Sequence, residues 1–319
     1  MIQLIRIINI KDCLADMYRY SQQKFFDQLI KNEGEIMINQ KRIAAIHDIS
    51  CFGRCSLTVA LPIISSLGIE VSPIPTAVLS THTGGIDGYT YRDLTDDILP
   101  IVRHWQSLNI GFNAIYTGFL GSFEQLDIVS EIFDTLKTQK SLIVVDPVMA
   151  DNGKLYKIFP SDFPAGMRKL CEKADVIVPN ITEAVLLLGE PYLEGPYTRP
   201  YIERLLLRLS ELGPKQVVLT GIYFNDTQLG AVSYDAETKR IEYAFSNRVD
   251  GYYHGTGDVF ASVLIGAILN GCELPKAVKT AVDFTVQSIE RTKAAGTDIR
   301  FGVNFEAGLP RLAQRLGLI

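Results

Sequence analysis

Apolar residues between positions 42 and 221 come in short, nearly continuous runs that alternate with stretches of helical periodicity. The runs are mostly β-branched, and each ends in a polar, Gly or Pro turn. The pattern predicts strands over 42–48, 114–118, 141–147, 175–180 and 216–221, and helices over 95–108, 122–138, 181–188 and 201–212. Strands that are apolar throughout are covered on both faces, so we expect an α/β fold with a mostly parallel central sheet and helices on both faces.

Residues 229–245 follow a different pattern, in which apolar and polar residues alternate on both sides of an Asp/Glu/Thr/Lys turn. Such alternation predicts a small antiparallel hairpin at one side of the sheet. Residues 257–291 predict two buried helices. Because no internal repeat or low-complexity linker interrupts residues 41–319, we expect one domain there.

Residues 1–40 form an N-terminal extension with only weak amphipathic patterning and no glycine before Gly34. Met37 follows Glu33-Gly34-Glu35, whose codons can contain the purine run of a bacterial ribosome-binding site. One hypothesis is that Met37 is the natural start and that residues 1–36 are a translated leader. The other is that residues 1–36 are a genuine N-terminal helix. The intact mass of the protein from its native cell distinguishes them.

Composition excludes several classes of function. The net charge is −5 and no cluster of Lys and Arg occurs, which argues against nucleic-acid binding. No apolar run is long enough to span a bilayer, so we expect no membrane partner. The five cysteines are scattered, and Cys51 and Cys55 lack a second Cys/His pair for zinc. Reduced thiols of a cytoplasmic protein are the simplest interpretation.

The stretch HGTGDVFAS (254–262) carries the clearest candidate chemistry. Gly255, Thr256 and Gly257 begin a helix whose first N–H groups are unpaired, and the two glycines let an anion approach them closely. Asp258 could then take a proton from an alcohol while the amides hold a phosphoryl group. The alternative is that Asp258 only complements the positive end of the helix. The chain has neither a P-loop nor a dinucleotide-binding glycine motif.

Acidic and amide side chains follow two of the predicted strands. Asp146 ends the strand over 141–147, and Asn180 and Glu183 lie at the next strand–helix junction. Open α/β sheets bind ligands beyond the carboxyl ends of their strands, so these groups should converge. Carboxylates with a few waters are typical ligands of magnesium. The alternative for each residue is a helix cap or a first-turn acid.

A second polar group lies at the other side of the sheet, after the first strand and after residues 72–79. Asp48, Ser80, His82 and Thr83 could face a polar small molecule, although a lone histidine such as His82 is more often structural. The glycines at 84, 85 and 88 make the following loop a plausible cover for such a site.

These segments, taken together and in this order, resemble the pyridoxal kinases of the ribokinase-like superfamily from about residue 43 to residue 312. The motifs that carry the resemblance are HDISCFGRCS (47–56), STHTG (80–84), YTGFLGS (116–122), DPVM (146–149), PNITE (179–183), VVLTG (217–221) and GTGD (255–258). The combination is far more specific than any one of them.

The resemblance implies that Asp258 is the catalytic base toward the substrate's 5′-hydroxyl and that Gly255, Thr256 and Gly257 form the anion hole. It also implies ATP and Mg²⁺ as cofactors and a homodimer. By the same resemblance, magnesium and the ATP phosphates are held by Asp146 and Glu183, with Asn180 in support. The residues beside the nucleotide are Thr220, Gly221, Ser246, Arg248 and Val249. The pyridine substrate meets Asp48 and Thr83, with Ser80, His82 and Tyr116 nearby.

The function that follows is ATP-dependent phosphorylation of the 5′-hydroxyl of pyridoxal, pyridoxine or pyridoxamine. A hydroxymethylpyrimidine kinase is the nearest alternative, but that group usually has Cys at position 258. Sugar kinases of the superfamily usually have Ala where this chain has Thr256. A non-catalytic vitamin B6 carrier would need no proton acceptor. Two departures from the family pattern are Asp48, where many members have Ser, and a short segment between Val249 and Gly255.

Overall fold

The computed structural model describes residues 40–319, of which Lys41–Ile319 form one compact unit. The expectations for residues 1–39, including a start at Met37, lie outside the described residues. Within the described part of the chain, nine strands form one sheet in the order β11-β10-β9-β8-β5-β4-β1-β2-β3. The pairs from β2 through β1, β4, β5 and β8 to β9 are parallel, whereas β3, β10 and β11 are antiparallel to their neighbours.

The strands of this sheet are β1 (Arg42–Phe52), β2 (Glu70–Thr81), β3 (Tyr91–Asp93), β4 (Ala114–Thr117), β5 (Leu142–Val145), β8 (Val176–Ile177), β9 (Gln216–Asn225), β10 (Gln228–Asp235) and β11 (Arg240–Asn247). A separate small hairpin consists of β6 (Ala150–Asp151) and β7 (Lys154–Leu155).

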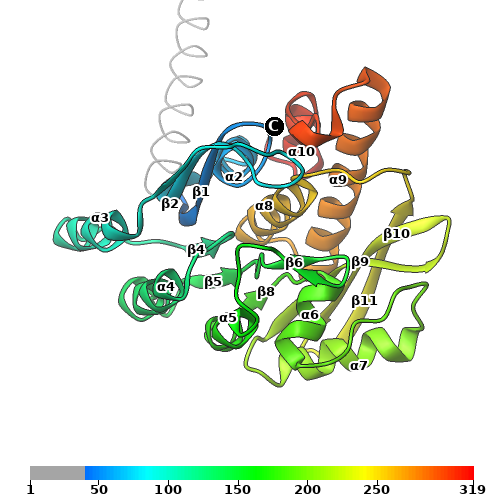
Figure 1. Ribbon diagram of the computed structural model, residues 1–319, viewed down its shortest axis with the longest axis horizontal. Coiled ribbons are helices and arrows are strands. Elements are labelled where there is room, and N and C mark those ends of the chain that lie inside the picture. Colours follow the sequence, from blue (N-terminus) through cyan, green and yellow to red (C-terminus); the bar gives the residue numbers. More distant parts are fainter. Residues whose placement is uncertain (1–39) are drawn as a thin grey trace, which may run out of the picture. The chain divides into compact units, whose positions relative to one another are not determined.

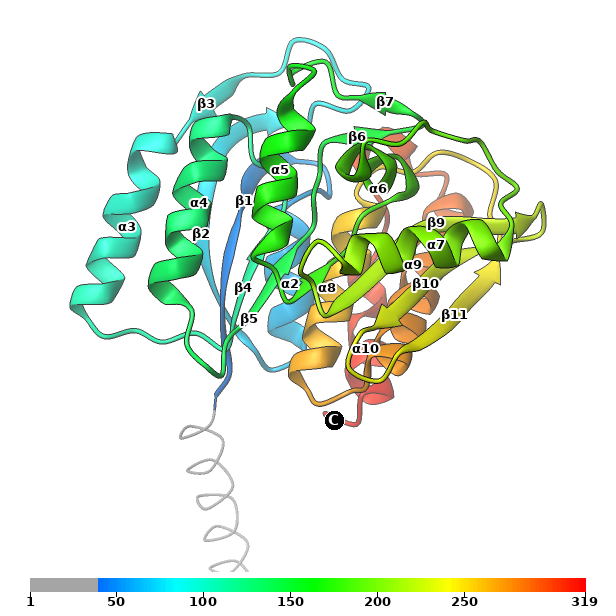
Figure 2. The same ribbon diagram turned by 90° about the horizontal axis from the view of Figure 1, so that it is seen from below.

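Helices cover both faces of the sheet (Figure 1). One face carries α3 (Thr95–Ser107), α4 (Phe123–Leu136), α5 (Phe163–Glu172), α6 (Ile181–Leu188) and α7 (Arg199–Ser210), which Figure 2 shows in front of the strands. The other carries α2 (Leu57–Ser66), α8 (Thr256–Leu269), α9 (Leu274–Ala295) and α10 (Leu309–Arg315). Among residues 40–319, no helix has the length and apolar character that crossing a membrane requires.

Successive residues of the parallel strands pack on opposite faces, which explains why these strands are apolar throughout. In β5, Val144 joins the core under α8 and Val145 joins the core under α4 and α5. Both side chains are fully buried, as expected for a strand between two helical layers. The predicted α/β fold is thereby confirmed, and the predicted hairpin over 229–245 is the β10–β11 pair.

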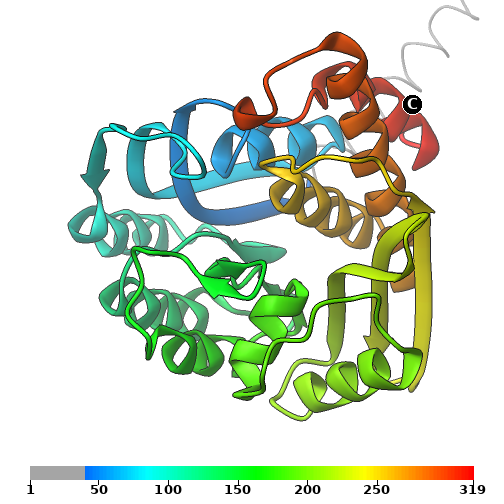
Figure 3. The ribbon, with the colours of Figure 1, turned by 45° about the vertical axis from the view of Figure 1, so that its right-hand side comes forward.

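Strand β9 is longer than predicted, because it continues past Gly221 to Asn225. Gly221 has a left-handed backbone (φ 73°), and the pairing of β9 with β10 shifts register at Gly230. An irregularity of this kind lets a strand continue beyond a glycine that the sequence marks as its end. Figure 3 shows the long β9–β10–β11 ribbon at one edge of the sheet, with α7 and α9 on its two sides.

Candidate active site

The carboxyl ends of the central parallel strands lie level with one another. The backbone N–H of Asp146 donates to the Thr117 carbonyl at the end of β4 (3.0 Å), and the N–H of Thr220 donates to the Pro179 carbonyl (3.0 Å). Asn180 and Thr220 also form an isolated parallel bridge. The sheet therefore brings Asp146, Asn180 and Thr220 to one edge from three different strands. The sequence predicts this convergence for Asp146 and Asn180, together with Glu183.

The glycine motif forms the N-terminus of α8 at this edge. Gly255 is the N-cap residue and has a left-handed backbone, φ 72° and ψ 2°. Gly257 lies in the first turn, is exposed, and has no atom within 4 Å of the place where a β-carbon would stand. The unpaired N–H groups of this turn are thus open to an anion from outside, which is the geometry of an anion hole.

The carboxylate of Asp258 lies in the same first turn. Burial raises the pKa of Asp258 to about 7; a hydrogen bond from the Ser56 backbone opposes the shift and the nearby charge of Asp48 adds to it. A carboxyl group with a pKa near neutral is suited to take a proton at physiological pH, since a general base works best when its pKa is close to the operating pH.

Asn180 and Glu183 bind each other at the start of α6. The Glu183 backbone N–H donates to Asn180 Oδ1 (2.9 Å), and the Asn180 N–H donates to Glu183 Oε2 (2.8 Å), which makes a capping box. Glu183 Oε1 accepts from the backbone N–H of Met149 (3.2 Å), and Asn180 Nδ2 donates to the Ala150 carbonyl (2.8 Å). These contacts fix α6 to the chain that follows Asp146.

The two buried acids are held in an environment that disfavours negative charge. Burial raises the pKa of Asp146 well above its usual value, and the charges of Glu183 and Asp258 raise it further. Burial also raises the pKa of Glu183 to about 8, against the backbone hydrogen bonds from Asn180 and Met149 that lower it. A cation between these groups would relieve the repulsion, so their chemistry fits a divalent metal.

The described residues do not bring three or more Asp, Glu, His or Cys side chains together in an arrangement that could hold a metal ion without help. Magnesium usually keeps several waters and binds one or two carboxylates together with substrate phosphates. Asp146 and Glu183 are the two carboxylates that the sequence assigns to that task.

Among the residues expected to meet the pyridine substrate, Asp48 is a buried carboxylate within β1, where the pairing with β2 shifts register between His47 and Ile49. Its Oδ2 accepts from the Ser50 hydroxyl (3.2 Å). Burial raises the pKa of Asp48, whereas hydrogen bonds from Ser56 and Ser50 and the nearby His82 lower it. The charge of Asp48 adds to the raised pKa of Asp258, so Asp48 lies near the candidate base.

Two of the residues expected to lie near the pyridine substrate, Ser80 and His82, already form hydrogen bonds with other residues of the chain. The Ser80 hydroxyl accepts from the Thr90 backbone N–H (2.8 Å). His82 Nδ1 accepts from the Gly84 N–H (3.1 Å), and its Nε2 pairs with the Arg300 carbonyl. These contacts fix the turn after β2. Thr83, by contrast, is exposed.

Tyr116 occupies a different position from the other predicted acceptor residues. Its side chain has no exposed surface and packs edge-on against His47, with ring centroids 4.3 Å apart. It belongs to the core beneath α8. A contact of this side chain with substrate would require the core to open, so in this structure Tyr116 supports the site from below.

The predicted nucleotide residues lie along β9 and at the end of β11. Gly221 is exposed, and no atom lies within 4 Å of a β-carbon built there. Arg248 is exposed and its guanidinium carbon lies 5.0 Å from the centre of the Tyr223 ring. Ser246 pairs with Leu229 in the hairpin, and Val249 is half-buried at the start of the segment that leads to α8.

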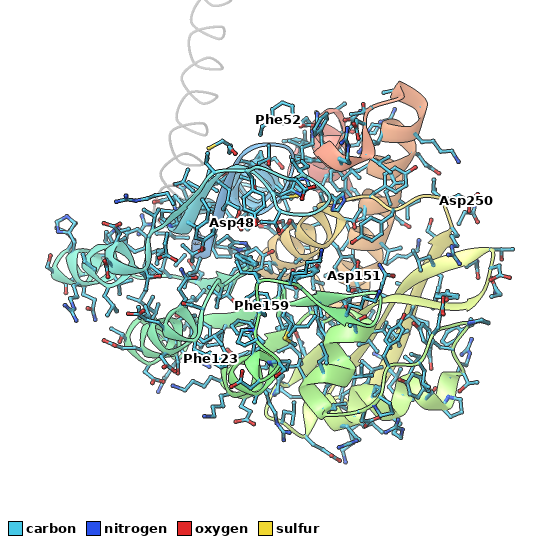
Figure 4. All side chains as sticks on the ribbon, in the orientation of Figure 1. Asp48, Phe52, Phe123, Asp151, Phe159 and Asp250 are labelled. Atoms are coloured by element: carbon cyan, nitrogen blue, oxygen red, sulfur yellow. The ribbon has the colours of Figure 1, made fainter. Side chains whose placement is uncertain are left out.

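Three residues at the site have no counterpart among the residues expected from the sequence: Asp151, Tyr252 and His254. The Tyr252 hydroxyl donates to Asp151 Oδ2 (2.6 Å), and the His254 ring lies 4.9 Å from the His82 ring. Figure 4 labels Asp151 on the β6–β7 hairpin, and Asp250 on the segment that leads from β11 into α8. Asp151 has a sequence signal, because it lies in a polar turn just after Asp146. Tyr252 has none.

Comparison with known proteins assigns this chain to a family. The family model described as phosphomethylpyrimidine kinase matches residues 64–302. The chain belongs to the phosphomethylpyrimidine kinase family. With this, the expected kinship with the pyridoxal kinases of the ribokinase-like superfamily is confirmed, and the protein is a kinase.

Three members illustrate the similarity. A structure of a Bacteroides thetaiotaomicron protein that carries the phosphomethylpyrimidine kinase name, in a crystal form with pyridoxal, is 41% identical; the match covers 86% of this chain and 96% of that one, with a TM-score of 0.82. The pyridoxal kinase of Lactobacillus plantarum is 32% identical and matches 86% of this chain and 98% of its own, with a TM-score of 0.79. The pyridoxal kinase of Dictyostelium discoideum is 26% identical over 269 residues, 79% of this chain and 87% of its own.

Proposed function

We propose that this protein transfers the γ-phosphoryl group of ATP to the 5′-hydroxyl of pyridoxal, pyridoxine or pyridoxamine. The observation that carries the proposal is the position of Asp258, whose pKa is raised to about 7, within the open first turn of α8. A binder or carrier needs no proton acceptor beside an anion hole. The vitamer is suggested by the pyridoxal in the crystals of the 41% identical relative and by the relatives named pyridoxal kinase.

In this proposal Asp258 takes the proton of the 5′-hydroxyl as the oxygen attacks the γ-phosphorus. The backbone N–H groups of Gly255, Thr256 and Gly257 hold the phosphoryl oxygens while the bond to the β-phosphate oxygen breaks. Phosphoryl transfer depends mainly on positioning and on electrostatic stabilisation of the equatorial oxygens, and fixed amides at a helix N-terminus supply both.

Asp146 and Glu183 would hold magnesium against the ATP phosphates, with Asn180 in support through the capping box. The ion supplies neutralisation of phosphate charge. The Asn180 N–H holds Glu183 Oε2 and the Met149 N–H holds Oε1, so the Glu183 carboxylate stays beside the chain that follows Asp146. Thr220, the exposed Gly221 and the Arg248–Val249 stretch would receive the nucleotide.

Asp48 and Thr83 would meet the pyridine ring, and Ser80, His82 and Tyr116 would support them. An ionised Asp48 can only accept hydrogen bonds. It would therefore favour a ring with a donor, such as a protonated pyridine nitrogen, over a ring without one. This distinguishes the site from one with Ser at the same position.

A hydroxymethylpyrimidine kinase is the second candidate, because the matching family model bears the phosphomethylpyrimidine kinase name. The same anion hole would serve that reaction. The residue that argues against it is Asp258, because the pyrimidine kinases usually have Cys there.

The test is ATP consumption by the purified protein with magnesium, offered pyridoxal, pyridoxine, pyridoxamine and hydroxymethylpyrimidine in separate reactions. Turnover on a B6 vitamer that disappears in Asp258→Asn supports the proposal. Turnover on the pyrimidine alone would assign the protein to the thiamin branch. Absence of turnover on all four, with pyridoxal still bound, would favour a carrier.

We further propose a cytoplasmic homodimer. Support for the compartment comes from the cysteines: the four in the described residues, Cys51, Cys55, Cys171 and Cys272, are all free thiols. Support for the dimer is the family resemblance. Light scattering of the purified protein at micromolar concentration measures the mass directly, and a monomeric mass would reject the dimer.

A further inference from the structure

Tyr252 connects two parts of the site that are far apart in the sequence. It lies in the segment 248–255, which leads from β11 to α8, and its hydroxyl donates to Asp151 Oδ2 in the β6–β7 hairpin (2.6 Å). Burial and the charge of Asp151 raise the pKa of the tyrosine, so the hydroxyl keeps its proton at neutral pH. A hydrogen bond from a neutral donor to a carboxylate is among the stronger kinds.

The hairpin that accepts this bond is itself firmly attached. Asn180 Nδ2 donates to the Ala150 carbonyl (2.8 Å), and the Gly153 N–H donates to the Thr182 hydroxyl (3.0 Å). Both donor–acceptor pairs join the hairpin to the start of α6. Tyr252 therefore reaches a fixed point of the structure and not a free loop.

Two residues further on, His254 connects the same segment to the turn after β2, which contains His82 and Gly84. Its ring meets the Tyr252 ring edge-on, with centroids 5.0 Å apart at 86°, and lies 4.9 Å from the His82 ring. A β-carbon at Gly84 would lie only 2.6 Å from Cε1 of His254, so the imidazole covers the Gly84 backbone directly. The segment thus spans from the hairpin to the turn after β2.

Segment 248–255 contains no helix or strand, and it ends at Gly255, the N-cap of α8. Its path, and hence the direction of the first N–H groups of α8, depends on contacts such as these. We propose that Tyr252 is a positioning residue for phosphoryl transfer, which acts through the Asp151 hydrogen bond and His254 to hold the anion hole between the hairpin and the acceptor turn. This inference rests on the proposed kinase function of the same site.

The chain offers a matched control in the neighbouring tyrosine. The Tyr253 hydroxyl donates to the Asp250 carbonyl (3.2 Å), a bond within the segment that ties it to nothing else. Tyr252→Phe and Tyr253→Phe both remove one hydroxyl and keep the ring. If the tie to the hairpin is what matters, only the first substitution should affect the reaction.

We expect Tyr252→Phe to lower kcat about 5- to 20-fold, the lower range for a hydrogen bond to a charged group, because the tyrosine is half exposed. The KM values for ATP and pyridoxal should stay within about threefold, since the hydroxyl touches neither ligand in this proposal. Tyr253→Phe should keep kcat within about twofold. Equal effects of the two substitutions, or a kcat above wild type for Tyr252→Phe, would overturn the proposal.

A double-mutant cycle separates the effect of the Tyr252–Asp151 hydrogen bond from any other role of Asp151. In an Asp151→Ala background, Tyr252→Phe should cause no further loss of kcat, because the bond is already broken. Fully additive losses would reject the tie as the route of action. This comparison holds even if Asp151 has a separate part in ATP binding.

Amide hydrogen exchange of residues 250–257 in the ligand-free protein tests the same idea without any turnover. We expect faster exchange in Tyr252→Phe than in wild type and in Tyr253→Phe. Unchanged exchange would reject the positioning role even if the wild type is an active kinase. If the wild type phosphorylates no vitamer, the proposed function fails, while exchange still reports whether Tyr252 holds the segment.

Discussion

The backbones of Gly255 and Arg54 approach each other so closely that no side chain fits between them. A β-carbon on Gly255 would lie 1.9 Å from the Arg54 carbonyl oxygen. Arg54 lies in the loop directly after β1, the strand that contains Asp48. The contact therefore joins the strand expected to meet the pyridine substrate to the proposed anion hole. The two halves of the proposed site thus meet at a contact between backbone atoms.

We expect Gly255→Ala to destabilise the protein and to abolish activity, because the new methyl group meets the Arg54 carbonyl and the residue must keep φ 72°. Strained left-handed residues alone cost about 1–3 kcal/mol. Thermal unfolding measures the loss. Gly257→Ala is the matched control: its methyl group meets no protein atom, so the unfolding temperature should stay the same or rise while kcat falls. Normal kcat in Gly257→Ala would argue against an anion at this turn.

Asp258→Asn should reduce turnover by about two to four orders of magnitude, the usual contribution of a general base. ATP binding should survive, which equilibrium binding of a fluorescent nucleotide can measure. Turnover near the wild-type rate would remove Asp258 from the mechanism. Loss of ATP binding as well would mean that the substitution disturbs the nucleotide site.

The pH dependence follows from the same carboxylate. Since burial raises the pKa of Asp258 to about 7, kcat/KM should fall as the pH drops below about 7 and the base becomes protonated. Folding stability has the opposite dependence, because an acid with a raised pKa in the folded state destabilises that state when it is ionised. The penalty is fully present above pH 7 and disappears toward pH 4. Asp258→Asn should therefore unfold at a higher temperature than wild type at pH 8 and at nearly the same temperature at pH 4.

Asn180→Ala should cost about 0.5–2 kcal/mol of folding stability as a lost helix cap. It should also lower kcat, because the Glu183 backbone N–H loses its acceptor Asn180 Oδ1 and the Ala150 carbonyl loses its donor Asn180 Nδ2, which loosens the start of α6 beside the proposed metal site. Ser122→Ala is the matched control, because Ser122 caps α4 through a bond to the Gln125 N–H (3.2 Å) and lies outside the proposed site. We expect Ser122→Ala to lose similar stability with normal kcat. Equal kcat in both variants would restrict Asn180 to a structural role.

Asp48→Asn should raise the KM for pyridoxal about tenfold and leave the KM for ATP unchanged, because the neutral amide no longer favours a ring with a positive donor. Steady-state kinetics with each substrate varied in turn gives both constants. A parallel rise in the KM for ATP would show that Asp48 acts on the whole site and not on the pyridine ring.

The sequence predicted the elements that depend on local pattern. The runs around Val144 and Val176 are apolar throughout because both faces of their strands are buried, and that property is visible without coordinates. The glycine motif was visible for a similar reason, since an open helix N-terminus needs residues without side chains at 255 and 257. The same reasoning could not extend β9 past Gly221, because the strand continues only through a shifted pairing with β10.

The pattern of residues along the chain could not predict contacts between segments that are far apart in the sequence. Nothing near Tyr252 indicates a bond to a residue 101 positions away, and nothing near His82 shows that both of its ring nitrogens are already engaged. Tyr116 illustrates a related case: the family resemblance places it near the substrate, and its side chain lies in the core beneath α8.

The covering of Gly84 by the His254 imidazole makes the two positions depend on each other. A β-carbon at position 84 would overlap the ring where it stands, 2.6 Å from Cε1. A side chain at position 84 therefore requires the His254 ring to move or to be replaced by a smaller residue, although 170 positions separate the two in the chain.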